Sequence, residues 1–169
     1  ACLYEVYDKQ KKINLILNLG STKNYASKNF YVGATCGRYA GRISNSKFNI
    51  KNKIYKLNGN EGKNTLHGGK IGFDRLEWKI HNHSKTKITY QLLSKDLDQG
   101  FPGDLNAECI FEIKNKSFFI KYQYKSNKLT HVNLTNHSYW NLNKNKKKTI
   151  FNHDLKINSE KYLEVTNKL

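Results

Sequence analysis

Two histidines in polar, glycine-bearing segments are the first candidates for chemistry in this chain. His67 lies in NTLHGGKIGFD (64–74), where two glycines follow it at once. His137 lies in NLTNHSYWNL (133–142). Imidazole titrates near neutral pH, so each ring is suited to general acid–base work. A single histidine is more often a structural residue, but two histidines together with the arginine motif GRYAGRI (37–43) indicate a site for a polar small molecule.

Other catalytic signatures are absent from the sequence. It contains no GxSxG, P-loop, GxGxxG or HExxH pattern. Ser138 stands beside His137, but adjacency does not make a catalytic triad, which needs a third, orienting group in space. Asp98 and Asp104 lie in the turn DQGFPGDL (98–105), which we interpret as structural. The three widely spaced cysteines show no metal-ligand spacing, so no metal site is predicted and reduced thiols in a cytoplasmic protein are expected.

The segments that must position the histidines alternate in polarity with a period of two. Residues 105–113 place Leu, Ala, Cys, Phe and Ile on one face, and residues 117–124 follow after the turn KNK, which predicts a hairpin. Residues 86–93 show the same period, and residues 48–50 and 54–57 flank a second KNK turn. The first strand is predicted at residues 13–19. These patterns predict an all-β fold, a large sandwich of antiparallel sheets.

Charge is the feature that first suggests a different class of protein. The net charge is +17, with 30 Lys plus Arg against 13 Asp plus Glu. Most of the basic residues are lysines scattered among asparagines, whereas proteins that read bases rely on arginine and on charge gathered on one face. We therefore interpret the scattered lysines as compositional drift on the solvent-exposed surface. No specific nucleic-acid partner is expected. No segment reaches the ~20 apolar residues of a membrane span, and no membrane partner is expected.

Four blocks in one order carry a resemblance to a known family. They are YVGATCGRYAGRI (31–43), NTLHGGKIGFD (64–74), DQGFPGDL (98–105) and NLTNHSYWNL (133–142). Together they resemble the signature blocks of aldose 1-epimerase, also called galactose mutarotase. The resemblance implies a galactose-mutarotase-like β-supersandwich, an aldose sugar as partner, and no cofactor.

The resemblance also implies roles for individual residues. His137 aligns with the catalytic acid that protonates the ring oxygen O5 of the sugar, and His67 aligns with a histidine that hydrogen-bonds near that oxygen. Arg42 aligns with a sugar-binding arginine of an NRI triplet that reads GRI here, with Gly41 in place of Asn. Gly41 is also expected to bind substrate, as are Ser138 and Tyr139 in the same block as His137.

The extent of the chain shapes the functional expectation. The family domain is about twice as long, the sequence holds no Met, and we expect residues 1–169 to be a single partial domain without the family's N-terminal start and C-terminal half. The resemblance implies an enzyme that interconverts α and β hexose anomers. Because the family's general base is a glutamate in that second half, the alternative is a catalytically inactive carbohydrate-binding fragment. A weaker third possibility is a basic β-domain for nucleic acid. A monomer or weak dimer in the cytoplasm is expected.

Overall fold

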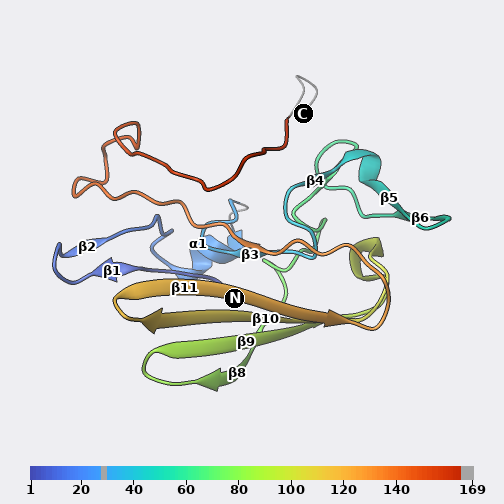
Figure 1. The fold of residues 1–169 in the computed structure, drawn as a ribbon, viewed down its shortest axis with the longest axis horizontal. Helices are drawn as coiled ribbons and strands as arrows, with labels where there is room; N and C mark the ends of the chain where they lie inside the picture. Colours follow the sequence, from blue (N-terminus) through green and yellow to red (C-terminus); the bar gives the residue numbers. More distant parts are fainter. Residues whose placement is uncertain (28–29, 165–169) are drawn as a thin grey trace.

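The computed structural model describes residues 1–27 and 30–164, and most of its regular structure is antiparallel β (Figure 1). The long strands are β8 (Lys79–His83), β9 (Lys87–Ser94), β10 (Leu105–Lys114) and β11 (Ser117–Ser126). The short strands are β1 (Tyr7–Asp8), β2 (Ile13–Asn14), β3 (Thr35–Cys36), β4 (Arg42–Ile43), β5 (Lys47–Ile50), β6 (Lys53–Lys56), β7 (Thr65–Leu66) and β12 (Thr135–Asn136). The helical turns in the described ranges are α1 (Thr22–Ser27), η1 (Ser44–Ser46) and η2 (Asp98–Gly100).

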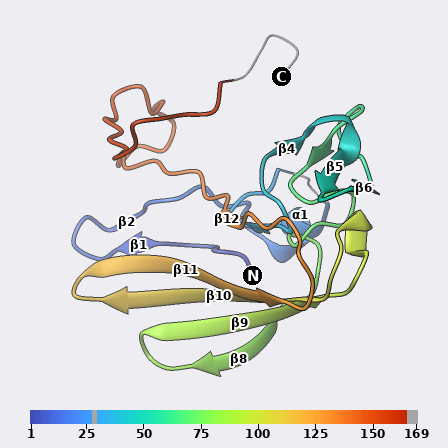
Figure 2. The ribbon, with the colours of Figure 1, turned by 45° about the vertical axis from the view of Figure 1, so that its right-hand side comes forward.

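The long strands form one four-stranded meander in the order β11-β10-β9-β8. The remaining strands pair as β1-β2, β12-β3, β4-β7 and β5-β6, and these short ladders lie over the meander rather than extending it (Figures 1 and 2). The antiparallel, all-β class predicted from the sequence is confirmed. The short helix α1 was not expected; it begins after Ser21, whose hydroxyl oxygen accepts the N–H of Asn24 at 3.3 Å.

The predicted hairpin of residues 105–113 and 117–124 is confirmed as β10 and β11. Asn115 and Lys116 join the two strands with φ values of 51° and 61°, the left-handed pair that a two-residue type I′ turn requires. The strand predicted at 86–93 is β9, and the hairpin predicted around Lys51 is β5 and β6. One residue of the predicted core face is an exception: Ile113 is 57% exposed, because it lies at the far end of β10, in the last pairs before the turn.

The first predicted strand, residues 13–19, is wrong over most of its length. Only Ile13 and Asn14 are in a strand, and Ile16 forms a single bridge with Trp140. The Asn14 side chain explains the break, because its Oδ1 accepts the backbone N–H groups of Val6 (3.1 Å) and Ile16 (3.3 Å). Such local side-chain bonds compete with a β-ladder for the backbone.

One face of the meander holds the core. Leu105, Ala107, Cys109 and Phe111 alternate along β10 and are buried, as the period of two predicts. The apolar side chains packed against them come from the N-terminal segment, from β9 and from the segments before β8 and β12, and they include Leu3, Ile16, Phe73, Trp78, Leu92, Val132 and Leu134. The segments that cover the sheet are the ones that carry the signature blocks, so the core also fixes the positions of those blocks.

The C-terminal part of the described chain makes few such contacts. Residues 143–164 run along the side of the molecule opposite the meander (Figures 1 and 2). Their large apolar side chains are at least half exposed, namely Ile150, Phe151, Leu155, Ile157, Tyr162 and Leu163. An exposed apolar surface of this kind favours association.

We expect the isolated 169-residue chain to self-associate as its concentration rises. The exposed apolar side chains of 143–164 and the open edges at β8 and β11 supply the contacts. Sedimentation velocity over a concentration series measures this, and the double variant Leu155→Lys, Leu163→Lys should shift association to higher concentration. A monodisperse wild-type monomer with one sharp, cooperative melt at all concentrations would contradict the prediction.

Candidate active site

The two histidine-bearing blocks are brought to the same place by pairing across the length of the chain. β12 pairs with β3, so that Asn136 lies opposite Thr35. Beyond the Asn136 end of this ladder, the N–H of His137 donates to the carbonyl oxygen of Ala34 at 2.8 Å, and the N–H of Gly33 donates to the carbonyl oxygen of His137 at 3.0 Å. His137 is therefore held by its backbone against the block that begins at Tyr31.

His67 is fixed by the ladder of β4 and β7. Its N–H donates to the carbonyl oxygen of Gly41 at 3.0 Å, and the N–H of Gly41 donates to Nδ1 of the His67 ring at 3.1 Å. Because Nδ1 accepts a hydrogen bond, the neutral ring carries its proton on Nε2. The free nitrogen of the neutral ring, Nε2, is therefore a hydrogen-bond donor.

The glycines after His67 are needed by the local backbone. Gly68 has a φ of +96°, and a Cβ at this position would lie 1.9 Å from the carbonyl oxygen of Gly37. The HGG segment therefore packs directly on the backbone of the GRYAGRI block. Only glycine permits this approach, which sets the distance between the His67 loop and the strand that leads to Arg42.

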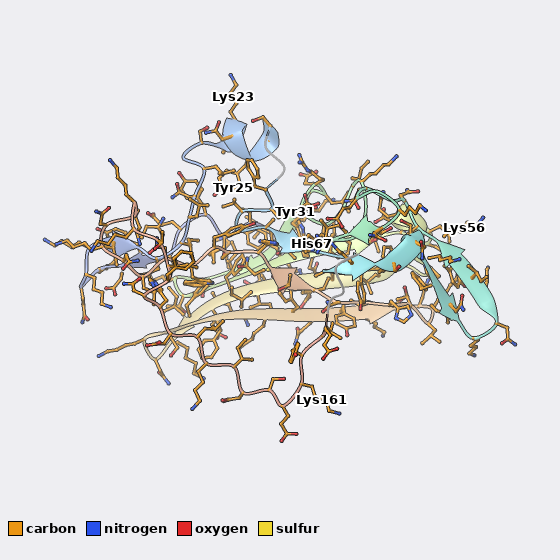
Figure 3. All side chains as sticks on the ribbon, turned by 90° about the horizontal axis from the view of Figure 1, so that it is seen from above. Lys23, Tyr25, Tyr31, Lys56, His67 and Lys161 are labelled. Carbon is orange, nitrogen blue, oxygen red and sulfur yellow. The ribbon has the colours of Figure 1, made fainter. Side chains whose placement is uncertain are left out.

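Aromatic rings join the two imidazoles. The ring centroids of His67 and His137 are 5.2 Å apart with an interplanar angle of 88°. Tyr31 contacts both, with ring centroids 4.7 Å from His67 and 5.8 Å from His137, and Figure 3 shows Tyr31 and His67 next to each other. Tyr139 lies 5.0 Å from the His137 ring. The structure thus brings together the two histidines that the sequence singled out.

The surroundings favour the neutral form of His67. Burial lowers the pKa of its imidazole below the usual 6.5, and the charges of His137 and Arg42 lower it further, while Glu61 acts in the opposite direction. A neutral His67 with its proton on Nε2 can donate a hydrogen bond to an uncharged oxygen.

Arg42 is exposed and engaged by a carboxylate. Its Nε and Nη2 donate to the two oxygens of Glu61 at 2.6 and 2.7 Å. This contact is also the first cause that lowers the pKa of Glu61 and raises that of Arg42. Glu61, as a strongly acidic partner of arginine, is a poor general base at neutral pH.

Ser138 and Tyr139 flank His137 in different ways. The backbone N–H of Ser138 donates to Oδ1 of Asn136 at 3.2 Å, while the Ser138 hydroxyl is buried without a hydrogen-bond partner within residues 1–27 and 30–164. Tyr139 is partly exposed, and its hydroxyl donates to the carbonyl oxygen of Phe30 at 3.2 Å. Gly41 contributes its backbone N–H to His67, as described above, rather than a side chain.

The two arginines of GRYAGRI have opposite roles. Arg38 is 2% exposed, and its guanidinium donates to the carbonyl oxygens of Ser94 and Gly103 at 3.0 and 2.8 Å. It also donates to the carbonyl oxygens of Lys95 and Pro102 at 3.1 and 3.0 Å. Arg38 therefore closes the loop between β9 and β10 from inside, whereas Arg42 faces solvent.

The acidic residues of the DQGFPGDL turn serve the same loop. Asp98 accepts a hydrogen bond from the Ser94 hydroxyl, and Asp104 accepts the backbone N–H of Asp96 at 2.8 Å. Burial lowers the pKa of the Arg38 guanidinium, and the nearby carboxylates of Asp98 and Asp104 offset part of this effect. These contacts fit the structural role expected for the turn.

The rings of Tyr31, His67, His137 and Tyr139 form a ring cluster. A cavity of about 470 Å³ opens beside it. Tyr31 lines it, together with the carboxylates of Glu61 and Asp74 and the cations of Lys70 and Arg75. Its volume lies in the range of small-molecule pockets. Two negative and two positive side chains balance one another, which suits an uncharged polar ligand better than an anion. No cluster of three His, Cys, Asp or Glu suited to a metal occurs in the described ranges.

Comparison with known proteins decides the family. A profile of the family described as aldose 1-epimerase matches residues 1–169. The chain belongs to the aldose 1-epimerase family. It is 39% identical over 146 residues to the aldose 1-epimerase of Haemophilus influenzae and 35% identical over 162 residues to the galactose mutarotase of Sus scrofa. These alignments cover 85% and 95% of this chain and 43% and 47% of the two relatives.

Solved structures agree with this family assignment. A galactose 1-epimerase from Lactobacillus acidophilus superposes with a TM-score of 0.75 at 32% identity, over 84% of this chain and 43% of the other. An aldose epimerase homologue from C. elegans superposes with a TM-score of 0.77 at 28% identity, over 83% of this chain and 45% of the other. The chain spans about half the length of the relatives it matches. No helix in the described residues is long and apolar enough to cross a membrane.

Two residues beside the site were not singled out from the sequence. Tyr31 is the first residue of the YVGATCGRYAGRI block, and an aromatic residue there gave no sign that it would contact both histidines. Glu61 is the only acidic residue of the loop NGNEGKNTLHGGK. A single acidic residue in a loop of Gly, Asn and Lys was the available signal. The pairing of Glu61 with Arg42 depends on the tertiary structure.

The low pKa of His67 leads to a prediction on pH. As the pH falls below 6.5, the unfolded chain binds a proton at this residue before the folded chain does, so stability should decrease until the lowered folded pKa is passed. Protonation would also remove the Nδ1 acceptor for Gly41. Histidine-selective NMR should give a His67 midpoint below 6.5, and His67→Gln should lose this part of the pH dependence of unfolding. A midpoint at or above 6.5 would contradict the prediction.

Proposed function

We propose that the protein containing this chain interconverts the α and β anomers of hexoses such as galactose and glucose. The observation that carries the proposal is the edge-to-face pair of His67 and His137, 5.2 Å apart, in a chain of the aldose 1-epimerase family. The balanced charge of the adjoining cavity supports a neutral sugar as the ligand.

The reaction requires two proton transfers and no covalent intermediate. A base removes the proton of the C1 hydroxyl while an acid protonates the ring oxygen O5, the ring opens, C1 rotates about C1–C2, and the ring closes on the other face. In the proposed assignment His137 is the acid, and His67 donates from Nε2 to the sugar near the same oxygen. Arg42 binds a sugar hydroxyl, and Ser138 and Tyr139 line the sugar beside His137.

The general base is assigned outside the described site. Glu61 is held by Arg42, which makes it unsuited to the role. The family resemblance implies a glutamate further along the domain, and this chain spans less than half the length of the relatives. Sugar binding without turnover is therefore the second candidate for the 169-residue chain by itself.

The test separates binding from turnover. The chain carrying ¹⁵N-labelled histidine is titrated with galactose, and shifts confined to His67 and His137 are expected, with the exposed His81 as an internal control. Polarimetry of fresh α-galactose then measures turnover above the uncatalysed rate. Binding without turnover supports the second candidate for this chain. Absence of any shift at saturating sugar would refute sugar binding by it.

Further proposals concern the protein as a whole. We propose that residues 1–169 form one partial domain, that the protein acts in the cytoplasm as a monomer or weak dimer, and that it has no specific nucleic-acid partner. With a net charge of +17, binding to heparin or DNA should be weak and should disappear at moderate salt.

A further inference from the structure

The ion pair of Arg42 and Glu61 joins the two segments that carry the sugar-binding candidates. The guanidinium uses Nε and Nη2 on the two carboxylate oxygens, at 2.6 and 2.7 Å, which is a bidentate fork. Nη1 of Arg42 has no hydrogen-bond partner within the described part of the chain. The pair therefore fixes the plane of the guanidinium and leaves one of its edges available to a ligand.

Glu61 stands on a closed loop. Its N–H donates to the carbonyl oxygen of Asn64 at 3.2 Å, and the N–H of Asn64 donates back to the carbonyl oxygen of Glu61 at 2.9 Å. The side chain of Asn60 donates to the carbonyl oxygens of Leu66 and Gly69, both at 3.0 Å, so it spans the His67 segment. The carboxylate is thus carried by the same hydrogen-bonded loop that carries His67.

Arg42, the other member of the ion pair, lies on a strand that is connected to His67 as well. Arg42 lies opposite Leu66 in the ladder of β4 and β7. Gly41, the residue before Arg42, donates its N–H to Nδ1 of His67 at 3.1 Å. Two contacts therefore tie the strand to the loop in addition to the ladder, one through Arg42 and Glu61 and the other through Gly41 and His67.

We propose that Glu61 is a positioning residue, which orients Arg42 for a sugar hydroxyl and keeps His67 in its Nε2–H form. The first part rests on the proposed function, since it assigns Arg42 a sugar hydroxyl. The second part does not, because the bond between Gly41 and His67 is present without a ligand. Glu61 acts through Arg42 and His67, and no contact of Glu61 with the sugar is required.

A second ion pair, between Lys121 and Glu112, provides the comparison for the pair of Arg42 and Glu61. Lys121 and Glu112 also form a contact of 2.6 Å, between β11 and β10, and neither residue touches the ring cluster. Exposed pairs of this type contribute little to stability. Glu112→Ala is therefore the matched control for Glu61→Ala, because both variants break a solvent-facing pair and only one of the pairs borders the site.

The experiment uses the full 169-residue chain with ¹⁵N-labelled histidine, at concentrations below its association range. In the wild type, the two ring nitrogens of His67 should report one tautomer, with the proton on Nε2. Glu61→Ala should mix the two tautomers of His67 and weaken galactose binding by about tenfold, the loss of roughly one charge-assisted hydrogen bond. Glu112→Ala should change neither. Tautomer and affinity both within twofold of wild type in Glu61→Ala would overturn the proposal.

A charge swap distinguishes positioning from simple pairing. The double variant Arg42→Glu, Glu61→Arg should restore the ion pair and the Nε2–H tautomer of His67, but not galactose affinity, because the guanidinium now projects from the opposite segment. Full recovery of affinity would overturn the positioning of Arg42. If the wild-type chain shows no response to galactose, the proposed sugar binding fails, and the tautomer of His67 in Glu61→Ala still decides the second part.

Discussion

His137→Ala should lower kcat by about 10²–10⁴ in a form of the protein that turns over galactose, with a smaller change in KM. The imidazole of His137 is the assigned proton donor to O5, whereas burial favours the neutral form of its neighbour His67, which is assigned a hydrogen bond rather than the proton transfer. The measurement is the change in optical rotation of fresh α-galactose, corrected for the uncatalysed rate. His81→Ala, an exposed histidine on β8, is the matched control and should keep the wild-type rate.

The neighbouring variants sharpen this assignment. His67→Ala and Arg42→Ala should affect both kcat and KM, since their hydrogen bonds are made to the sugar in the ground state and in the transition state. Asp104→Ala should leave the rate almost unchanged, apart from an effect on stability through its bond to Asp96. Full activity in His137→Ala together with loss of activity in Asp104→Ala would place the acid–base pair in the DQGFPGDL turn instead.

Arg38→Ala should lower the free energy of unfolding by at least about 4 kcal/mol. Removal of the guanidinium leaves a cavity and withdraws the donors from the carbonyl oxygens of Ser94, Pro102 and Gly103. It also leaves the carboxylates of the same loop without their buried partner. Urea unfolding followed by the fluorescence of the partly buried Trp78 measures the effect.

Arg42→Ala is the matched control, since it removes the exposed arginine of the same seven-residue motif. Its unfolding midpoint should stay close to that of the wild type. Equal shifts for the two variants would contradict the separation of a structural Arg38 from a ligand-binding Arg42, and would require a different account of how the loop between β9 and β10 is closed.

The sequence predicted the regular part of the fold because that part obeys local rules. The strands β9, β10 and β11 alternate in polarity over eight to ten residues, and the turn at Asn115 has a residue type that tolerates positive φ. The strands of two residues, such as β3, β4, β7 and β12, have no such period, and their pairing depends on partners elsewhere in the chain.

The site was predictable in part for a similar reason. The histidines and the HGG turn are recognisable by residue type and spacing, and the structure places the two rings together. The sequence could not separate Arg38 from Arg42, because burial of one and exposure of the other arise only from packing on the β9–β10 loop. Tyr31 and Glu61 were missed because their contacts are to residues distant in the chain.

The ladder between β3 and β12 determines at which stage of synthesis and folding the site can form. The side chain of Asn133 bonds the carbonyl oxygen of Ala40 across 93 residues, and that of Asn136 bonds Gly33 across 103. Closing such long loops costs more chain entropy than forming the hairpin at Asn115, so the meander should precede the imidazole pair during folding. On a ribosome that makes the chain from its N-terminus, His67 is present long before His137, and a nascent chain interrupted before residue 133 can hold a folded hairpin without any acid–base centre.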